Sequence, residues 1–195
     1  MKCLLFPLVH ANLFPLTTKP LNIFEPQYLQ MVRDSIETQT PIVLAYVAEG
    51  DSKYRDIAGY GIPQIIEQRE NNTILIFLPC VGKVKILTEE HDITKLYKRV
   101  EVEVINEDLN LDEKCKPMYV TLSKVLVQWI AKHIPDAQQR DVFINSLKGP
   151  QEVVNAFSAY LVRDYDMQYE LMEILNINDQ IEYLYRLLQS REVTS

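Results

Sequence analysis

Glycine is scarce in this chain, and its positions exclude a common class of function. The five glycines lie at positions 50, 59, 61, 82 and 149. A phosphate-binding loop places glycines just before a helix, so that backbone N–H groups can approach the phosphates. Gly59 and Gly61 are followed instead by Ile62 and Pro63, within an apolar run typical of a strand. The sequence therefore predicts no nucleotide site of the usual kinds, and we expect no cofactor.

Cysteine and histidine are also few, with three of each. They are Cys3, Cys80, Cys115, His10, His91 and His133. Their spacing matches neither a zinc site nor a disulfide framework, and scattered thiols are typical of a reducing, cytoplasmic location. Cys3 and Cys80 lie in apolar runs, where a buried and inert thiol is expected. We expect no metal site and no cysteine nucleophile.

No excess of basic residues is present, and no apolar run is long. The chain has 20 Lys and Arg against 27 Asp and Glu, a formal charge of -7, so we expect neither nucleic acid nor a membrane surface as partner. The apolar N-terminus is broken by Pro7 and His10, which argues against an export signal. No segment approaches the roughly 18 apolar residues that a membrane span needs.

Residues 1–110 are rich in patterns typical of strands. Residues 3–9 predict a short buried strand, with a proline that indicates a strand end or edge. The Asn71-Asn72 pair is suited to a tight hairpin turn. Further strands are predicted at 41–48, 57–68, 73–78, 81–87 and 97–105.

One helix is predicted inside this strand-rich half. It begins at Glu25-Pro26. Proline is favourable at the first helical position, because the N–H that it lacks would have no hydrogen-bond partner there. Tyr28, Val32 and Ile36 then recur on one face, and the helix should end before Pro41. Phe24, just before the helix, is predicted to anchor it to the core.

Residues 111–195 carry the period of amphipathic helices. A long helix opens at Pro117, and others are predicted at 136–147, from Pro150, at 166–175 and from Asn178 as its cap. Gly149 is predicted to cap the end of the second. The Met and aromatic side chains on the inner faces indicate core packing of a helical bundle. Neighbouring Ser and Lys residues on these helices diverge, so no catalytic constellation is found.

The opening of the chain resembles a known family. The run FPLVHANLFPLTTKPLNIFEPQY, residues 6–28, is similar to the start of the LON substrate-binding domain, the N-terminal domain of ATP-dependent Lon proteases. In that family a Leu-Phe-Pro step leads to Pro-Leu-x-Ile-Phe-Glu-x-Arg-Tyr. The run GYGIPQIIEQRENNTILIFLPCVGKVKI resembles the family's central hairpin and following strand, and YELMEILNINDQIEYLYRLL resembles its C-terminal helix pair.

Three positions depart from the family pattern. Pro15-Leu16 stands where the family has Pro-Gly, and Gln27 and Gln180 each stand where it has an arginine. Polar contacts made by those arginines in relatives are therefore not expected here.

The resemblance implies an α+β fold, in which an N-terminal PUA-like pseudo-β-barrel with one inserted helix (1–110) precedes a C-terminal helical bundle (111–195). It also implies a non-catalytic polypeptide-recognition module. We expect a stand-alone protein, because the sequence has neither the Walker motif of the Lon ATPase nor its Ser-Lys peptidase domain. An RNA- or small-ligand-binding PUA-like domain is the alternative.

The expected partners are unfolded or exposed apolar polypeptide and a protease, with a homo-oligomer left open. A partner would need an exposed apolar surface, and the irregular segment before the first helix offers one. The alternative is that these side chains only plug the barrel, because burial favours each by roughly 1.5–3 kcal/mol. The candidate binding residues are Phe14, Pro15, Leu16, Pro20 and Leu21.

Overall fold

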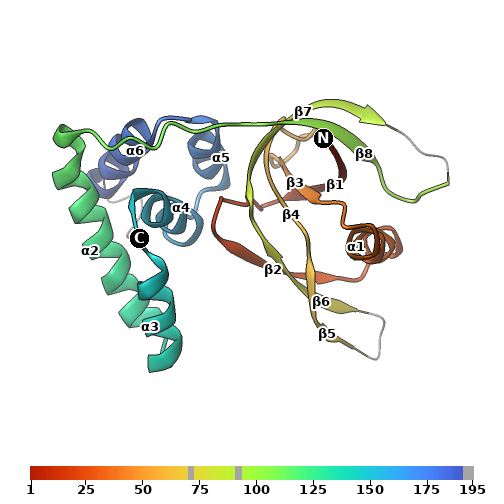
Figure 1. The fold of residues 1–195 in the computed structure, drawn as a ribbon, viewed down its shortest axis with the longest axis horizontal. Helices are drawn as coiled ribbons and strands as arrows, with labels where there is room; N and C mark the ends of the chain where they lie inside the picture. The colour runs from red at the N-terminus through yellow and green to blue at the C-terminus, as the bar shows by residue number, and fades with distance from the viewer. Residues whose placement is uncertain (70–72, 91–93, 191–195) are drawn as a thin grey trace. The chain divides into compact units, whose positions relative to one another are not determined.

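A computed structural model describes residues 1–69, 73–90 and 94–190 (Figure 1). The chain divides into two compact units, Met1–Ile105 and Asn106–Ser195, the first built around strands and the second of helices. The predicted α+β fold, a barrel with one inserted helix followed by a helical bundle, is confirmed. The turn predicted at Asn71-Asn72 lies outside the described residues.

Five strands close the barrel of the first unit. In pairing order they are β1 (Lys2–Val9), β3 (Ile42–Val47), β4 (Ile57–Gly61), β7 (Gly82–Glu90) and β8 (Arg99–Val104). β1 pairs in parallel with β3 on one side and antiparallel with β8 on the other. Because β1 has neighbours on both sides, the barrel leaves no open edge there.

Three more strands form a small sheet in the same unit. Their order is β2 (Thr18–Ile23), β6 (Ile74–Pro79) and β5 (Gln64–Gln68), all antiparallel. Pro20 and Gln64 both lie opposite Phe77, so these three side chains share one face of the sheet. A β-bulge between Ile65 and Glu67 interrupts the register of β5.

Two features of this sheet differ from the sequence prediction. The single strand expected at 57–68 is divided at Ile62-Pro63 into β4 and β5, which belong to different sheets. The segment treated as irregular contains β2. The alternation of polar and apolar residues in β2 is weak, because the polar Lys19 occupies a partly buried position and the apolar Pro20 occupies an exposed one.

Two apolar clusters fill the first unit. One includes Ile74, Ile76 and Leu78 of β6 together with Met31 and Val32 of the inserted helix. The other lies among β1, β3, β4, β7 and β8. Alternate residues of each strand supply these clusters, as period-two packing requires.

The inserted helix α1 (Pro26–Thr38) begins at the predicted proline. Tyr28, Leu29 and Ile36 pack against the core from this helix, as the spacing indicates. The prediction for Phe24 was wrong, since its side chain is 67% exposed. Ile23 takes the core position instead, because it ends β2 on the inward face and the next residue points outward.

In the described part of the second unit, residues 106–190, a short 3₁₀ turn at Glu113–Cys115 is followed by five helices. They are α2 (Lys116–His133), α3 (Ala137–Ser146), α4 (Pro150–Tyr160), α5 (Tyr165–Glu173) and α6 (Ile177–Ser190). The predicted inner face of α2 buries Leu122, Leu126 and Ile130. By contrast, α3 buries no residue of its own.

Two predicted helix caps were wrong. Gly149 is the N-cap of α4 and not the C-cap of the helix before it. The first turn of α6 is capped by Asn176, whose side-chain oxygen accepts from the Asn178 N–H at 2.8 Å. The Asn178 side chain instead holds residues 110–112, accepting from the Asp112 N–H and donating to the Asn110 carbonyl.

None of the helices within residues 1–69, 73–90 and 94–190 combines the length and the apolar composition that crossing a bilayer requires.

Gly61 marks a close approach of two backbone segments in the first unit. A Cβ added there would lie 1.8 Å from the Pro79 carbonyl oxygen. We expect Gly61→Ala to lower the free energy of unfolding by about 3 kcal/mol or more, because backbone must move. Gly82→Ala is the control, since its Cβ would meet only the Tyr60 ring at 3.4 Å. Urea unfolding of both variants tests this, and equal stabilities would contradict the packing described.

Candidate functional site

An exposed row of side chains runs along β2 and beyond both of its ends. Leu16, Pro20 and Phe24 are exposed, and the polar residues between them, Thr18 and Asn22, are exposed too. We call the three apolar residues, together with Phe77 opposite Pro20, the outer row. Phe77 is 38% exposed, so the row widens to a second strand at its middle.

The five predicted binding residues are divided by this geometry. Leu16 is 55% exposed and Pro20 is exposed, and both belong to the outer row. Phe14 is 1% exposed and Pro15 is buried, so neither offers a surface to a partner. Leu21 is half-buried and packs against the core. Phe24 and Phe77 are exposed as well, although the sequence did not predict either of them as a surface residue.

The sequence carries only a weak signal for Phe24, because apolar and polar residues do not alternate cleanly between Leu16 and Ile23; the alternation is clear in the structure. From Leu16 to Phe24 every second residue is exposed, which is the period of a strand whose outer face meets solvent. Because Ile23 points into the core, the strand period places its neighbour Phe24 on the outer face. Phe77 has a similar position in β6, between the buried residues Ile76 and Leu78.

Leu16 has an unusual backbone conformation. Its φ is 61°, in the left-handed region that glycine adopts readily and a leucine adopts at a cost of about 1–2 kcal/mol. The turn is closed by Thr17, whose N–H and hydroxyl both donate to the Phe14 carbonyl. Leu16 stands where the LON family pattern given above has glycine. It therefore adds an exposed side chain to a strained turn.

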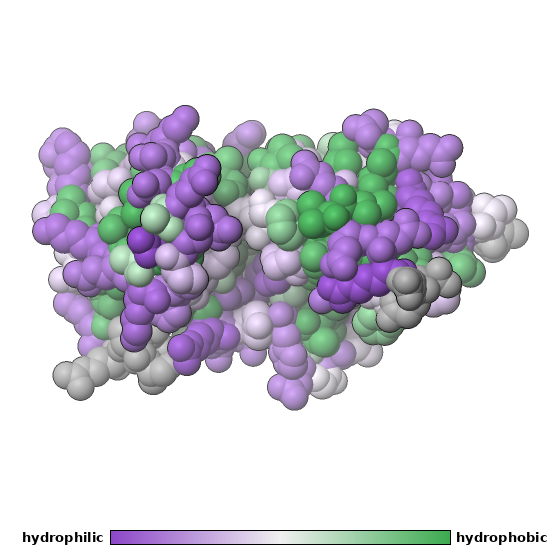
Figure 2. Space-filling model, turned by 90° about the horizontal axis from the view of Figure 1, so that it is seen from below, coloured by the Kyte–Doolittle hydropathy of each residue, from purple (hydrophilic) through white to green (hydrophobic). Residues whose placement is uncertain are grey.

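Among the described residues, no further strand pairs with the far edge of the small sheet. All five residues of β5 are exposed, and β5 ends the strand order β2-β6-β5. Ile65 and Ile66 add exposed apolar surface along this edge. Figure 2, which views the molecule from below, shows hydrophobic side chains gathered over the barrel unit in the right half of the picture.

A second feature of the first unit is a cavity of about 590 Å³. It is lined by residues of β1, α1 and β3, by residues 52–54, and by Glu89 and residues 96–98. Three tyrosines contribute to its wall, and we call it the tyrosine pocket after Tyr28, Tyr54 and Tyr97.

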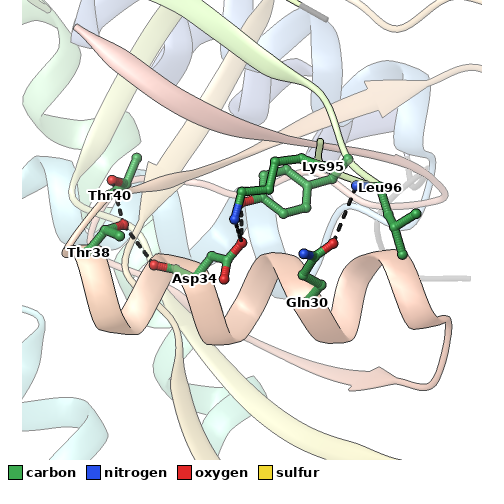
Figure 3. Close-up of polar contacts among 7 residues, drawn as sticks. Gln30, Asp34, Thr38, Thr40, Lys95 and Leu96 are labelled. Carbon is green, nitrogen blue, oxygen red and sulfur yellow. Dashed lines mark hydrogen bonds and ion pairs between the residues drawn. The ribbon is translucent and has the colours of Figure 1, made fainter. Parts of the chain in front are cut away.

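One wall of the tyrosine pocket is fastened to α1 by polar contacts (Figure 3). The Asp34 carboxylate accepts from the Lys95 ammonium at 2.8 Å and from the Tyr97 hydroxyl at 2.6 Å. The Gln30 side-chain oxygen accepts from the Leu96 N–H at 3.3 Å. Segment 95–97 therefore follows the position of the helix.

These contacts shift two pKa values. Burial alone would raise the pKa of Asp34, but hydrogen bonds from Lys95 and Tyr97 outweigh it and hold that pKa below its ordinary value. Burial, followed by the hydrogen bond to ionised Asp34, raises the pKa of Tyr97 to about 12. At neutral pH the carboxylate is charged and the phenol is protonated, which is the pairing that the hydrogen bond requires.

The three cysteines lie inside the protein and are not joined in disulfides. Cys3, Cys80 and Cys115 are all buried. Burial raises the pKa of Cys3 to about 11, so its thiol stays protonated and weakly nucleophilic at neutral pH.

Asp34→Asn should destabilise the protein in a pH-dependent way. The amide loses the charge that Lys95 pairs with, so we expect a loss of about 1–2 kcal/mol at neutral pH. The depressed pKa of Asp34 means that its contribution is present above the ordinary value of 3.8 and lost as pH falls through the depressed value. Urea unfolding of the wild type and the variant at several pH values measures this. A difference that does not change with pH would contradict it.

Leu16→Gly should stabilise the protein. Relief of the left-handed strain outweighs the extra chain entropy of glycine, and we expect a gain of about 0.5–1 kcal/mol. Leu16→Ala keeps the strain and serves as the control, with no gain expected. Thermal unfolding of both variants tests this, and a less stable Leu16→Gly protein would show that the side chain contributes packing.

Comparisons with known proteins agree with the fold. No curated protein matches the sequence. Two solved structures share the fold over 97% of this chain and 98% of theirs. The N-terminal domain of Lon protease from Mycobacterium avium complex has a TM-score of 0.75 at 10% identity. The Lon N-terminal domain protein from Xanthomonas campestris has a TM-score of 0.70 at 17% identity.

The sequence also matches a family as a whole. The match covers residues 2–190, so it includes both the barrel unit and the helical unit. The chain therefore belongs to the family of ATP-dependent protease La (LON) substrate-binding domains.

Proposed function

We propose that this protein is a non-catalytic module that recognises exposed apolar segments of unfolded polypeptides, as an adaptor or chaperone-like factor in protein quality control. The observation that carries the proposal is the outer row, in which Pro20 and Phe77 of the small sheet, and Leu16 and Phe24 just beyond the ends of β2, expose apolar side chains. The family description supports it, because the substrates of a protease are polypeptides.

The spacing of the outer row suits an extended client. Pro20 and Phe24 are four residues apart, which corresponds to about 13 Å along a strand. An unfolded segment with apolar residues at the same alternate spacing could cover both. Because the contact is apolar and little of it depends on side-chain shape, the site would accept many sequences.

The open edge at β5 supports binding of an extended chain by its backbone. Unpaired N–H and C=O groups at a sheet edge can add another strand, a common mode of peptide recognition. The edge also carries the features that limit aggregation, namely the bulge before Glu67 and the exposed ion pair of Glu67 with Arg69 at 3.1 Å. A client would therefore meet an edge that does not readily pair with a second copy.

A binding measurement with a paired substitution tests the proposal. The probe is a fluorescently labelled, reduced and carboxymethylated polypeptide that stays unfolded in buffer. We expect Phe24→Ser combined with Phe77→Ser to weaken its binding by about tenfold or more, since loss of apolar contact worth about 1.4 kcal/mol has that effect. Fluorescence anisotropy gives the dissociation constants.

Val142→Ser is the control, because Val142 is an apolar residue of α3 in the other unit and its exposure, 65%, is close to the 67% of Phe24. Binding that is absent in the wild type, or equally weakened by the control, would refute the proposal. Titration with single-stranded RNA at low and high salt accompanies the measurement, and salt-sensitive RNA binding without polypeptide binding would favour the alternative.

A further inference from the structure

The tyrosine pocket is separate from the outer row in the residues that form it. Its lining contains none of Leu16, Pro20, Phe24 or Phe77. Its volume of about 590 Å³ lies in the usual range for small-molecule sites, roughly 300–1,000 Å³. It therefore calls for an explanation beyond the binding of unfolded chains.

Aromatic and aliphatic groups form much of the wall. The Tyr28 ring packs on Phe6 with centroids 4.4 Å apart, and Leu5, Pro7 and Val47 add aliphatic surface. A β-bridge between Val47 and Tyr54 fixes the backbone on one side of the pocket. These groups favour a ligand with an apolar body, because its burial removes apolar surface from water on both partners.

Two of the three tyrosine hydroxyls are already engaged. Tyr97 donates to Asp34, and Tyr54 donates to Glu89 at 3.0 Å. Glu89 also accepts from the Lys98 ammonium at 2.6 Å. Since the carboxylate is satisfied by two donors, the charge that it presents to a ligand is compensated.

The remaining charge of the lining is positive. Among the described residues of the lining, Lys53 and Lys98 are the cations and Glu89 is the one carboxylate. Glu89 pairs with Lys98, and Lys53 forms no ion pair with any residue in the part of the chain that the structure describes. This surplus of one cation is notable in a protein with a formal charge of -7. It favours a monoanion, whereas a phosphate or other dianion would lie near Glu89 with only one uncommitted cation to balance it.

We propose that the tyrosine pocket binds a small organic monocarboxylate with an aromatic or branched aliphatic body. The body lies against the rings of Tyr28, Tyr54 and Tyr97, and the carboxylate meets the Lys53 ammonium. Asp34 and Gln30 keep segment 95–97 in place, so the wall is formed before the ligand arrives.

A pair of probes that differ in charge alone tests this. The full chain is titrated with N-acetylphenylalanine and with its neutral amide, and backbone nitrogen-proton correlation NMR spectra follow the response. We expect the acid to shift signals of residues 52–54 and 96–98 saturably, with a dissociation constant of about 0.1–1 mM. The amide should bind about fivefold more weakly.

Lys53→Gln completes the design. It should weaken binding of the acid to the level of the amide and leave binding of the amide unchanged. Lys53 is exposed, so the variant should fold normally. Lys85→Gln, at an exposed lysine of β7 outside the pocket, is the control and should bind the acid as the wild type does.

Three results with the acid, the amide and the variant would overturn the assignment. They are the absence of saturable shifts at these residues, equal affinity for acid and amide, and no effect of Lys53→Gln. An eight-residue peptide with the same C-terminal residue is the last probe. If it binds more than about tenfold tighter than the free acid, the occupant is a chain end and the small-molecule assignment fails.

Discussion

The parallel pairing of β1 with β3 is the constraint on which the rest of the barrel unit depends. Parallel neighbours cannot be joined by a tight turn, so the chain must cross over between Val9 and Ile42. That crossover contains β2 and α1. The outer row and the fastened wall of the tyrosine pocket both arise from segments that barrel closure places outside the barrel strands.

The crossover also explains how one short segment serves packing and surface together. β2 contributes Ile23 to the core and exposes Pro20 and Asn22 on its other face, because successive side chains of a strand point to opposite sides. Phe14 enters the core before the strand begins, and Leu16 leaves it at a left-handed turn. A segment rich in prolines and large apolar residues is thus divided between core and surface residue by residue.

The strand-then-helix order could be predicted because each half has its own period. The amphipathic helices of the second half, the proline that starts α1 and most of the barrel strands follow from local patterns. The two wrong cap predictions show what local patterns cannot predict. Asn178 has the side chain of a good cap, but it is used to hold residues 110–112, and Asn176 caps the helix instead. Competition between partners distant in sequence decided this.

The amino-acid sequence by itself determined the family, through the runs that resemble it, and the α+β class, because the local period changes from that of strands to that of helices. It also marked the segment from Phe14 to Phe24 as unusually rich in apolar residues and proline. Only the tertiary structure decided which of its side chains are exposed and that a pocket exists. The pocket needs Tyr54 and Tyr97, which are far apart in sequence, and Asp34 on a third segment to fasten the wall. Exposure and enclosure depend on long-range packing, and no local period of the chain records them.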